Sequence, residues 1–263
     1  MRLRFFNMQG FLFADTKDLE HANLGRQQDN SFFRSKKKIL FYILLCTCLQ
    51  ACNPMVRPEK ENFIAIYDHE KVVLDKFPPN TRWLGFAKQE YFPLKQLQAF
   101  TKLERLQLSS PKYNNFLELQ QLTNLKTLNI SGTSISQIQS IPRLAINKLI
   151  LSSTSIQNLR GIEKFAGLTH LELNHTNIQS IAPLEALYRI KHLYIQHTAI
   201  SDIQALKNSK NLYNLYLKGS KVSDLNPIMD LPELTFLEIT GLDIPKEQIE
   251  KLQKKLPYLA IIR

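Results

Sequence analysis

The sequence predicts an α/β solenoid, in which a curved parallel β-sheet forms the concave side and 3₁₀ or irregular segments form the convex side. Two observations lead to this fold: a period of about 22 residues, and a change of apolar spacing inside each period. Leucine or isoleucine opens seven successive units, at Leu103, Leu125, Ile146, Leu168, Ile190, Leu212 and Leu234. A unit this short cannot bury its apolar side alone, so consecutive units are expected to stack.

The unit that opens at Leu168 illustrates the pattern. Leu171 and Leu173 flank Glu172, and this alternation is typical of a strand with one buried face. Aliphatic residues then recur at intervals of three, at Ile178, Ile181, Leu184 and Leu187. That spacing favours a chain that returns along the back of the coil in 3₁₀-like steps. Each unit is therefore expected to contribute one strand and one back segment.

A hydroxyl side chain follows the strand in five consecutive units. These residues are Thr133, Thr154, Thr176, Thr198 and Ser220. A buried hydroxyl at a turn can satisfy a neighbouring backbone group. We prefer this structural role to the alternative of a row of reactive hydroxyls.

The repeats are expected to fill residues 81–240, with two looser and more aromatic units at the beginning. Terminal units of a solenoid are usually atypical because they cap its open ends. Residues 63–80 contain two short apolar runs around a polar turn, and we interpret them as an N-terminal cap.

The C-terminal segment, residues 241–263, departs from the repeat and is predicted to form the second cap. Ile249 and Leu252 have helical spacing, and Pro245 precedes them where a first turn tolerates proline. Residues 258–262 then read as a short final strand. A helix followed by a strand would close the open end of the coil.

The N-terminal region predicts export. An apolar run, residues 39–49, follows a basic stretch; it is too short to span a bilayer and fits the core of a signal peptide. We assign residues 35–51 to this signal. Its ending, Leu49-Gln50-Ala51-Cys52, resembles a bacterial lipobox, which implies a lipid on Cys52 and an anchor in the membrane. An ordinary signal peptide and a signal anchor are the alternatives.

The segments on either side of the signal have simpler interpretations. Residues 1–34 fit no signal peptide, so we interpret them as a gene-model extension or a disordered segment. Residues 52–62 comprise the lipidated Cys52 and a polar tether. The only other cysteines, Cys46 and Cys48, would leave with the signal, so no disulfide is expected.

Over about residues 81–263 the pattern L-x-x-L-x-L, followed by a hydroxyl residue, resembles bacterial leucine-rich repeat lipoproteins of the internalin-like class. The resemblance implies a leucine-rich repeat solenoid. It also implies that the helix and strand at the end are a cap. One departure is the hydroxyl position, where that family usually has Asn.

The outward strand positions of the later units are predicted to bind a partner. Early units carry small polar residues there, such as Gln107 and Asn129, whereas later units carry aromatic rings, imidazoles and carboxylates. Protein interfaces favour such aromatic centres with polar edges. The alternative is that Tyr and Phe simply cover a sheet well. The candidate partner-binding residues are His170, Glu172, His192, Tyr194, Tyr216, Phe236 and Glu238.

Histidines at 22-residue offsets raise the alternative of a metal site. His170 should neighbour His192, and His175 should neighbour His197. Two imidazoles and Glu172 could hold Zn²⁺. Duplication of surface residues is the simpler explanation, so we expect no metal and no cofactor.

The function predicted is therefore binding rather than catalysis. The sequence has no Gly-rich phosphate loop, nucleophile elbow or H-E-x-x-H motif. Its formal net charge is +11 without a basic stripe interleaved with aromatics, so we expect no nucleic-acid partner. We predict a monomeric protein-binding module, lipid-anchored in the bacterial envelope at the outer membrane or cell surface. The alternatives are a structural envelope scaffold, or a metal- or glycan-binding site on the His- and Tyr-bearing units.

Overall fold

The computed structural model describes residues 63–263. The predicted signal peptide, the predicted lipidation site Cys52, the tether and the segment 1–34 lie outside the described residues.

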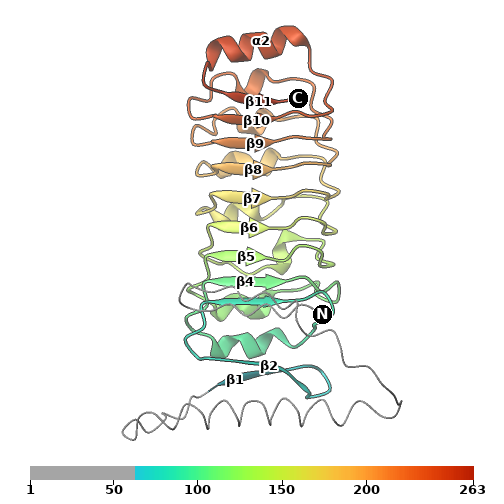
Figure 1. The fold of residues 1–263 in the computed structure, drawn as a ribbon, viewed down its shortest axis with the longest axis vertical. Helices are drawn as coiled ribbons and strands as arrows, with labels where there is room; N and C mark the ends of the chain where they lie inside the picture. The colour runs from blue at the N-terminus through green and yellow to red at the C-terminus, as the bar shows by residue number, and fades with distance from the viewer. Residues whose placement is uncertain (1–62) are drawn as a thin grey trace, which may run out of the picture. The chain divides into compact units, whose positions relative to one another are not determined.

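Nine parallel strands form one sheet, and they follow one another in chain order from β3 to β11 (Figure 1). The strands are β3 (Trp83–Phe86), β4 (Arg105–Leu108), β5 (Thr127–Asn129), β6 (Lys148–Ile150), β7 (His170–Glu172), β8 (His192–Tyr194), β9 (Asn214–Tyr216), β10 (Phe236–Glu238) and β11 (Ala260–Ile262). The central residue of each three-residue strand from β5 to β10 is buried, and its two neighbours are half-buried. The alternation predicted from the sequence therefore holds.

The return segments contain short 3₁₀ helices, as the three-residue apolar spacing predicts. They are η2 (Leu94–Ala99), η3 (Leu117–Gln121), η4 (Ile138–Ser140), η5 (Ile162–Phe165), η6 (Ala182–Ala186), η7 (Gln204–Leu206) and η8 (Asn226–Ile228). One continuous apolar core runs from the first repeat to the last between these segments and the sheet. The predicted solenoid is thus confirmed.

Buried threonines close the turn after each strand in four consecutive repeats. Each hydroxyl donates to the carbonyl oxygen three residues earlier, at 2.6–2.8 Å, in Thr133, Thr154, Thr176 and Thr198. The predicted structural role of these hydroxyls is confirmed. Ser220 differs, because it is half-buried and its Oγ instead accepts a 3.4 Å bond from the Val222 amide.

The N-terminal end is a two-stranded antiparallel hairpin, β1 (Ile64–Tyr67) and β2 (Val73–Phe77). Ile66 is fully buried in the common core, and the Phe77 ring packs edge-on against the ring of Phe86 in the first repeat. The hairpin therefore covers apolar surface that the first repeat would otherwise expose.

The C-terminal end carries the helix α2 (Lys246–Lys255) and the strand β11, which pairs in parallel with β10. Figure 1 shows α2 beyond the last strand of the stack. Ile249 and Leu252 bury one side of the helix, as their spacing predicts. Pro245 stands just before the helix, where its missing N–H costs no helical hydrogen bond. Within residues 63–263 no helix is both long and apolar enough to cross a bilayer.

Candidate functional site

Strict register between neighbouring repeats aligns the outward side chains of β7 to β10 into two rows. One row runs through His170, His192, Asn214 and Phe236, and the other through Glu172, Tyr194, Tyr216 and Glu238. Neighbouring parallel strands lie about 4.8 Å apart, so flat side chains in one row stack face to face. All seven predicted partner-binding residues are brought together on this face, which we call the late sheet face (residues 170–240, outward positions of β7–β10).

The centre of the late sheet face is a three-ring cluster. The rings of Tyr194 and Tyr216 stack with centroids 4.3 Å apart and planes at 11°. The Phe236 ring lies 5.0 Å from the Tyr216 ring, tilted by 38°. The 22-residue offset between Tyr194 and Tyr216 predicts that their rings lie side by side, and the structure confirms it. Each ring is half-buried by the others, so little conformational freedom remains to be lost when a partner docks.

The phenol of Tyr194 stays neutral at physiological pH. Burial raises the pKa of Tyr194 to about 12, and the adjoining Tyr216 hydroxyl, which shares a hydrogen bond with it, and the Glu172 carboxylate act in the same direction. A neutral phenol can both donate and accept a hydrogen bond. The cluster therefore offers an apolar body with polar hydroxyl groups.

A pair of imidazoles borders the cluster. His170 and His192 stack with centroids 4.2 Å apart and planes at 26°, and the Thr169 hydroxyl lies 2.8 Å from Nδ1 of His170. Burial lowers the pKa of His170 below its usual value, and the charges of His192 and Lys148 lower it further, against an opposing effect of Glu172. Burial, then Lys191 and Lys148, lowers the pKa of His192 as well. Both rings therefore favour the neutral state.

From their places at the two ends of the row, we expect Glu172 and Glu238 to frame the aromatic centre with negative charge, but the structure treats the two carboxylates differently. Glu172 forms a 2.7 Å salt bridge with Lys148, so its negative charge is balanced. Glu238 accepts a 2.6 Å hydrogen bond from Nε2 of Gln196 and forms no salt bridge within residues 63–263. The net negative charge therefore sits at the β10 edge.

Sequence reasoning missed Lys148 and Gln196 as parts of this surface. Both occupy outward positions, but each contacts its carboxylate across strands and in a different row. Lys148 is one repeat before Glu172, and Gln196 is two repeats before Glu238. A search for opposite charges on diagonal positions of adjacent strands would have found the first pair.

The predicted second histidine pair also exists, on a turn after the strands. His175 and His197 stack with centroids 4.5 Å apart and planes at 11°. Among residues 63–263, no three His, Cys, Asp or Glu side chains gather closely enough to hold a metal ion. Glu172 in particular is engaged by Lys148 rather than by an imidazole.

Comparison with known proteins supports the solenoid fold described above. Residues 139–244 match the family described as the leucine-rich repeat domain of the endo-β-N-acetylglucosaminidase EndoS. The fold is a leucine-rich repeat solenoid. A search of curated proteins finds no match.

Several solved leucine-rich repeat structures resemble this solenoid. Internalin C2 of Listeria monocytogenes is 23% identical, with a TM-score of 0.61 over 71% of this chain and 84% of its own. A leucine-rich repeat protein of Leptospira interrogans is 21% identical, with a TM-score of 0.56 over 64% of this chain and 45% of its own.

A plant structure shares the same architecture. The leucine-rich repeat ectodomain of the receptor kinase GASSHO1/SCHENGEN3 of Arabidopsis thaliana, solved in complex with CASPARIAN STRIP INTEGRITY FACTOR 2, is 17% identical. Its TM-score is 0.53 over 69% of this chain and 26% of that ectodomain. At these identities the likeness concerns the fold, and bacterial internalin-like proteins are among those that share it.

Proposed function

We propose that this chain is a non-enzymatic interaction module that holds a protein partner on the late sheet face. The observation that carries the proposal is the half-buried ring cluster of Tyr194, Tyr216 and Phe236 on the outward side of β8 to β10. Stacked aromatic side chains bury much apolar area per residue and are enriched in the centres of protein interfaces. Leucine-rich repeat solenoids present such sheets as binding surfaces.

The chemistry around the cluster supports a protein partner. The neutral imidazoles of His170 and His192 continue the flat surface on the β7 side. Glu238 supplies an unbalanced carboxylate on the β10 side. An apolar centre with one charged edge gives a partner both burial and orientation.

Site-specific photo-crosslinking in intact cells tests this proposal and captures the partner covalently. A photoreactive phenylalanine at Asn214, beside Phe236 in its row, is expected to yield one discrete protein adduct. The same residue at Gln107 of β4 is the matched control and is expected to yield none. A discrete adduct from Gln107, or none from Asn214, would contradict the proposal.

The proposal includes an envelope location through a lipid on Cys52. The support is the sequence Leu49-Gln50-Ala51-Cys52 after a short apolar run preceded by basic residues. Cys52→Ser is expected to abolish lipidation and to move the protein from the membrane to the soluble fraction. Cys46→Ser is the control, because that cysteine would be removed with the signal. If Cys52→Ser still partitions with membranes as the unchanged chain does, the lipid anchor is ruled out.

A further inference from the structure

In six consecutive repeats one position adopts a left-handed backbone, with φ values between 53° and 74°. In five of them it directly precedes the hydroxyl residue. Glycine, which tolerates this conformation, occupies it in three repeats, but serine or histidine occupies it in three others. In order, the residues are Gly132, Ser153, His175, His197, Gly219 and Gly241.

The two histidines are held in this strained conformation by hydrogen bonds between repeats. The His175 amide donates to the Gln196 carbonyl at 3.0 Å, and the His197 amide donates to the Lys218 carbonyl at 2.8 Å. Residues kept in sparsely populated conformations cluster at functional sites, because surrounding structure must maintain them. The chain therefore bears a conformational cost to place two imidazoles where glycine would suffice.

The imidazoles form an exposed and ordered platform. The His175 and His197 rings stack at 4.5 Å, and both side chains are exposed. A Cβ on Gly219 would lie 2.6 Å from Nδ1 of His197, so the ring of His197 occupies the space that glycine leaves open. On the other side the same position holds Ser153, whose short side chain is too small to cover the His175 ring.

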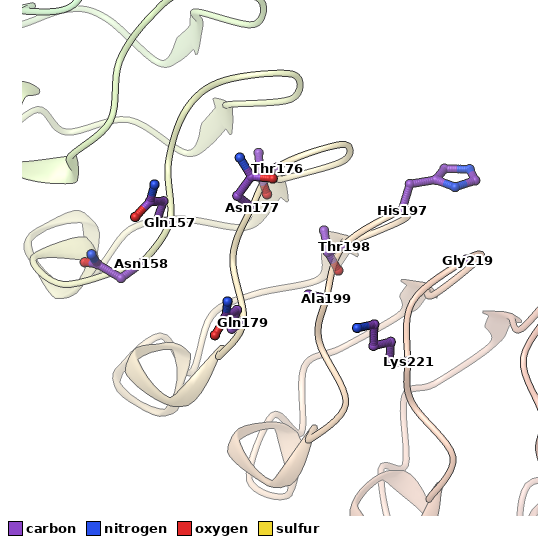
Figure 2. Close-up of a pocket in the computed structure, with 10 residues that line it drawn as sticks. All are labelled: Gln157, Asn158, Thr176, Asn177, Gln179, His197, Thr198, Ala199, Gly219 and Lys221. Carbon is purple, nitrogen blue, oxygen red and sulfur yellow. The ribbon is translucent and has the colours of Figure 1, made fainter.

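A groove of about 780 Å³ lies on the flank of the solenoid, and the platform meets it through His197, whereas His175 does not line it. Figure 2 shows Gln157, Asn158, Asn177 and Gln179 arranged along successive coils, with His197 and Lys221 farther along. The volume is within the range of small-molecule sites, roughly 300–1,000 Å³. The side chains that line it are amides, hydroxyls, one imidazole and one lysine, with no carboxylate.

The amides of this lining suit a hydroxyl-rich ligand. Each Asn or Gln amide offers a donor and an acceptor side by side, which suits adjacent hydroxyl groups. Gln157 and Gln179 occupy the same position in consecutive repeats, about 4.8 Å apart along the stack, close to the length of one sugar ring in an extended chain. A ligand with repeated hydroxyl groups would meet a glutamine amide at this position in two consecutive repeats, and the hydroxyl of Ser201 in the next.

We infer that this flank groove binds a linear neutral oligosaccharide across two or three repeats. The Asn177 and Gln179 amides bond its hydroxyl groups, and the His175–His197 platform packs against a sugar ring. The site is separate from the late sheet face and does not rest on the protein-binding proposal.

Calorimetric titration of the purified full chain tests the inference. The probes are hexamers of β-1,4-linked glucose and of β-1,4-linked N-acetylglucosamine, with acidic polygalacturonate hexamer as the comparison. At least one neutral probe is expected to bind saturably. Asn177→Ala/Gln179→Ala is expected to weaken its binding at least tenfold. Gln204→Ala/Asn208→Ala, which removes exposed amides outside the groove, is expected to leave binding unchanged.

His175→Gly/His197→Gly separates a functional role from a structural one. Glycine relieves the strained backbone, so the unfolding temperature is expected to stay the same or rise while oligosaccharide binding weakens at least tenfold. Tyr194→Ala/Tyr216→Ala is expected to leave saccharide binding unchanged. No saturable binding of either neutral probe would overturn the inference. Full binding by the glycine or the Asn177/Gln179 variant, or binding of the acidic probe alone, would also overturn it.

Discussion

The early strands β4 to β6 and the late strands β7 to β10 share one backbone but differ in how their outward side chains interact. On β5, Asn129 accepts bonds from the amide and hydroxyl of Ser131, two residues away on the same chain segment. On β8 and β9, Tyr194 and Tyr216 stack across repeats, and Gln196 reaches Glu238 across two strand spacings. The outward Asn129 is thus satisfied locally, whereas from Lys148 of β6 onward outward side chains contact one another across repeats.

This difference teaches where specificity can arise on a repetitive scaffold. The inward residues are interchangeable: Leu106, Leu128, Leu171 and Leu193 are all buried at equivalent positions. Because register is fixed by that core, any side chain on the outward face stands beside its counterpart in the next repeat. A cluster therefore needs only suitable residues at one position of consecutive repeats.

The largest effect is expected from breaking the core that both halves share. Leu193 is 0% exposed, so Leu193→Asp would bury a carboxylate without a partner. We expect a loss of at least about 3 kcal/mol in the free energy of unfolding, spread over neighbouring repeats. Gln107→Asp, on the exposed early face, is the control and should change stability by less than about 0.5 kcal/mol. Urea melts that ranked the two variants in the opposite order would contradict the inward assignment of Leu193.

A smaller effect is expected at the hydroxyl position. Thr198→Val keeps the shape of the side chain but removes its 2.8 Å bond to the Ile195 carbonyl, at a cost of about 1 kcal/mol plus any stranded acceptor. Ser220→Ala removes only a half-buried acceptor with a 3.4 Å contact. In chemical denaturation, Ser220→Ala should therefore lower the free energy of unfolding less than Thr198→Val does. Equal losses for the two variants would show that the hydroxyl bond contributes nothing specific.

The smallest effect concerns the His170 and His192 pair of the late face. Because folding lowers the pKa of both rings, the unfolded chain binds more protons below pH 6.5. Their contribution to stability is present above pH 6.5 and falls as pH decreases toward the lowered pKa of the folded state. Between pH 7.5 and pH 5.5, the unfolding temperature should fall less for His170→Gln/His192→Gln than for the unchanged chain. An identical fall in unfolding temperature would mean that folding does not lower the pKa of the two imidazoles.

Much of the solenoid could be predicted from sequence because its cause is local and repeated. The alternation around Leu171 and the spacing of Ile249 and Leu252 each reflect one buried face. The same offsets predicted that Tyr194 would lie beside Tyr216. The charge balance was not predicted: the Lys148–Glu172 and Gln196–Glu238 contacts run diagonally, where side-chain length and rotamer decide which partner is reached.

The flank groove was missed for a different physical reason. Its platform depends on the backbone conformation of His175 and His197, which spacing alone does not reveal. Glycine at 132, 219 and 241 was the available signal, since it marks a left-handed turn that the two histidines must also adopt. The left-handed backbone of the two histidines can therefore be predicted only when the repeats are aligned and glycine is seen at the same position of other repeats.

The central claim is that the late sheet face, rather than the solenoid as a whole, carries partner affinity. The most direct measurement is the dissociation constant of the captured partner for two matched double variants. Tyr194→Ala/Tyr216→Ala should weaken binding by about 2 kcal/mol or more without loss of fold, and Gln107→Ala/Asn129→Ala should leave it nearly unchanged. An unchanged constant in the tyrosine variant would contradict the claim. A loss confined to the Gln107/Asn129 variant would place the binding site on the early strands instead.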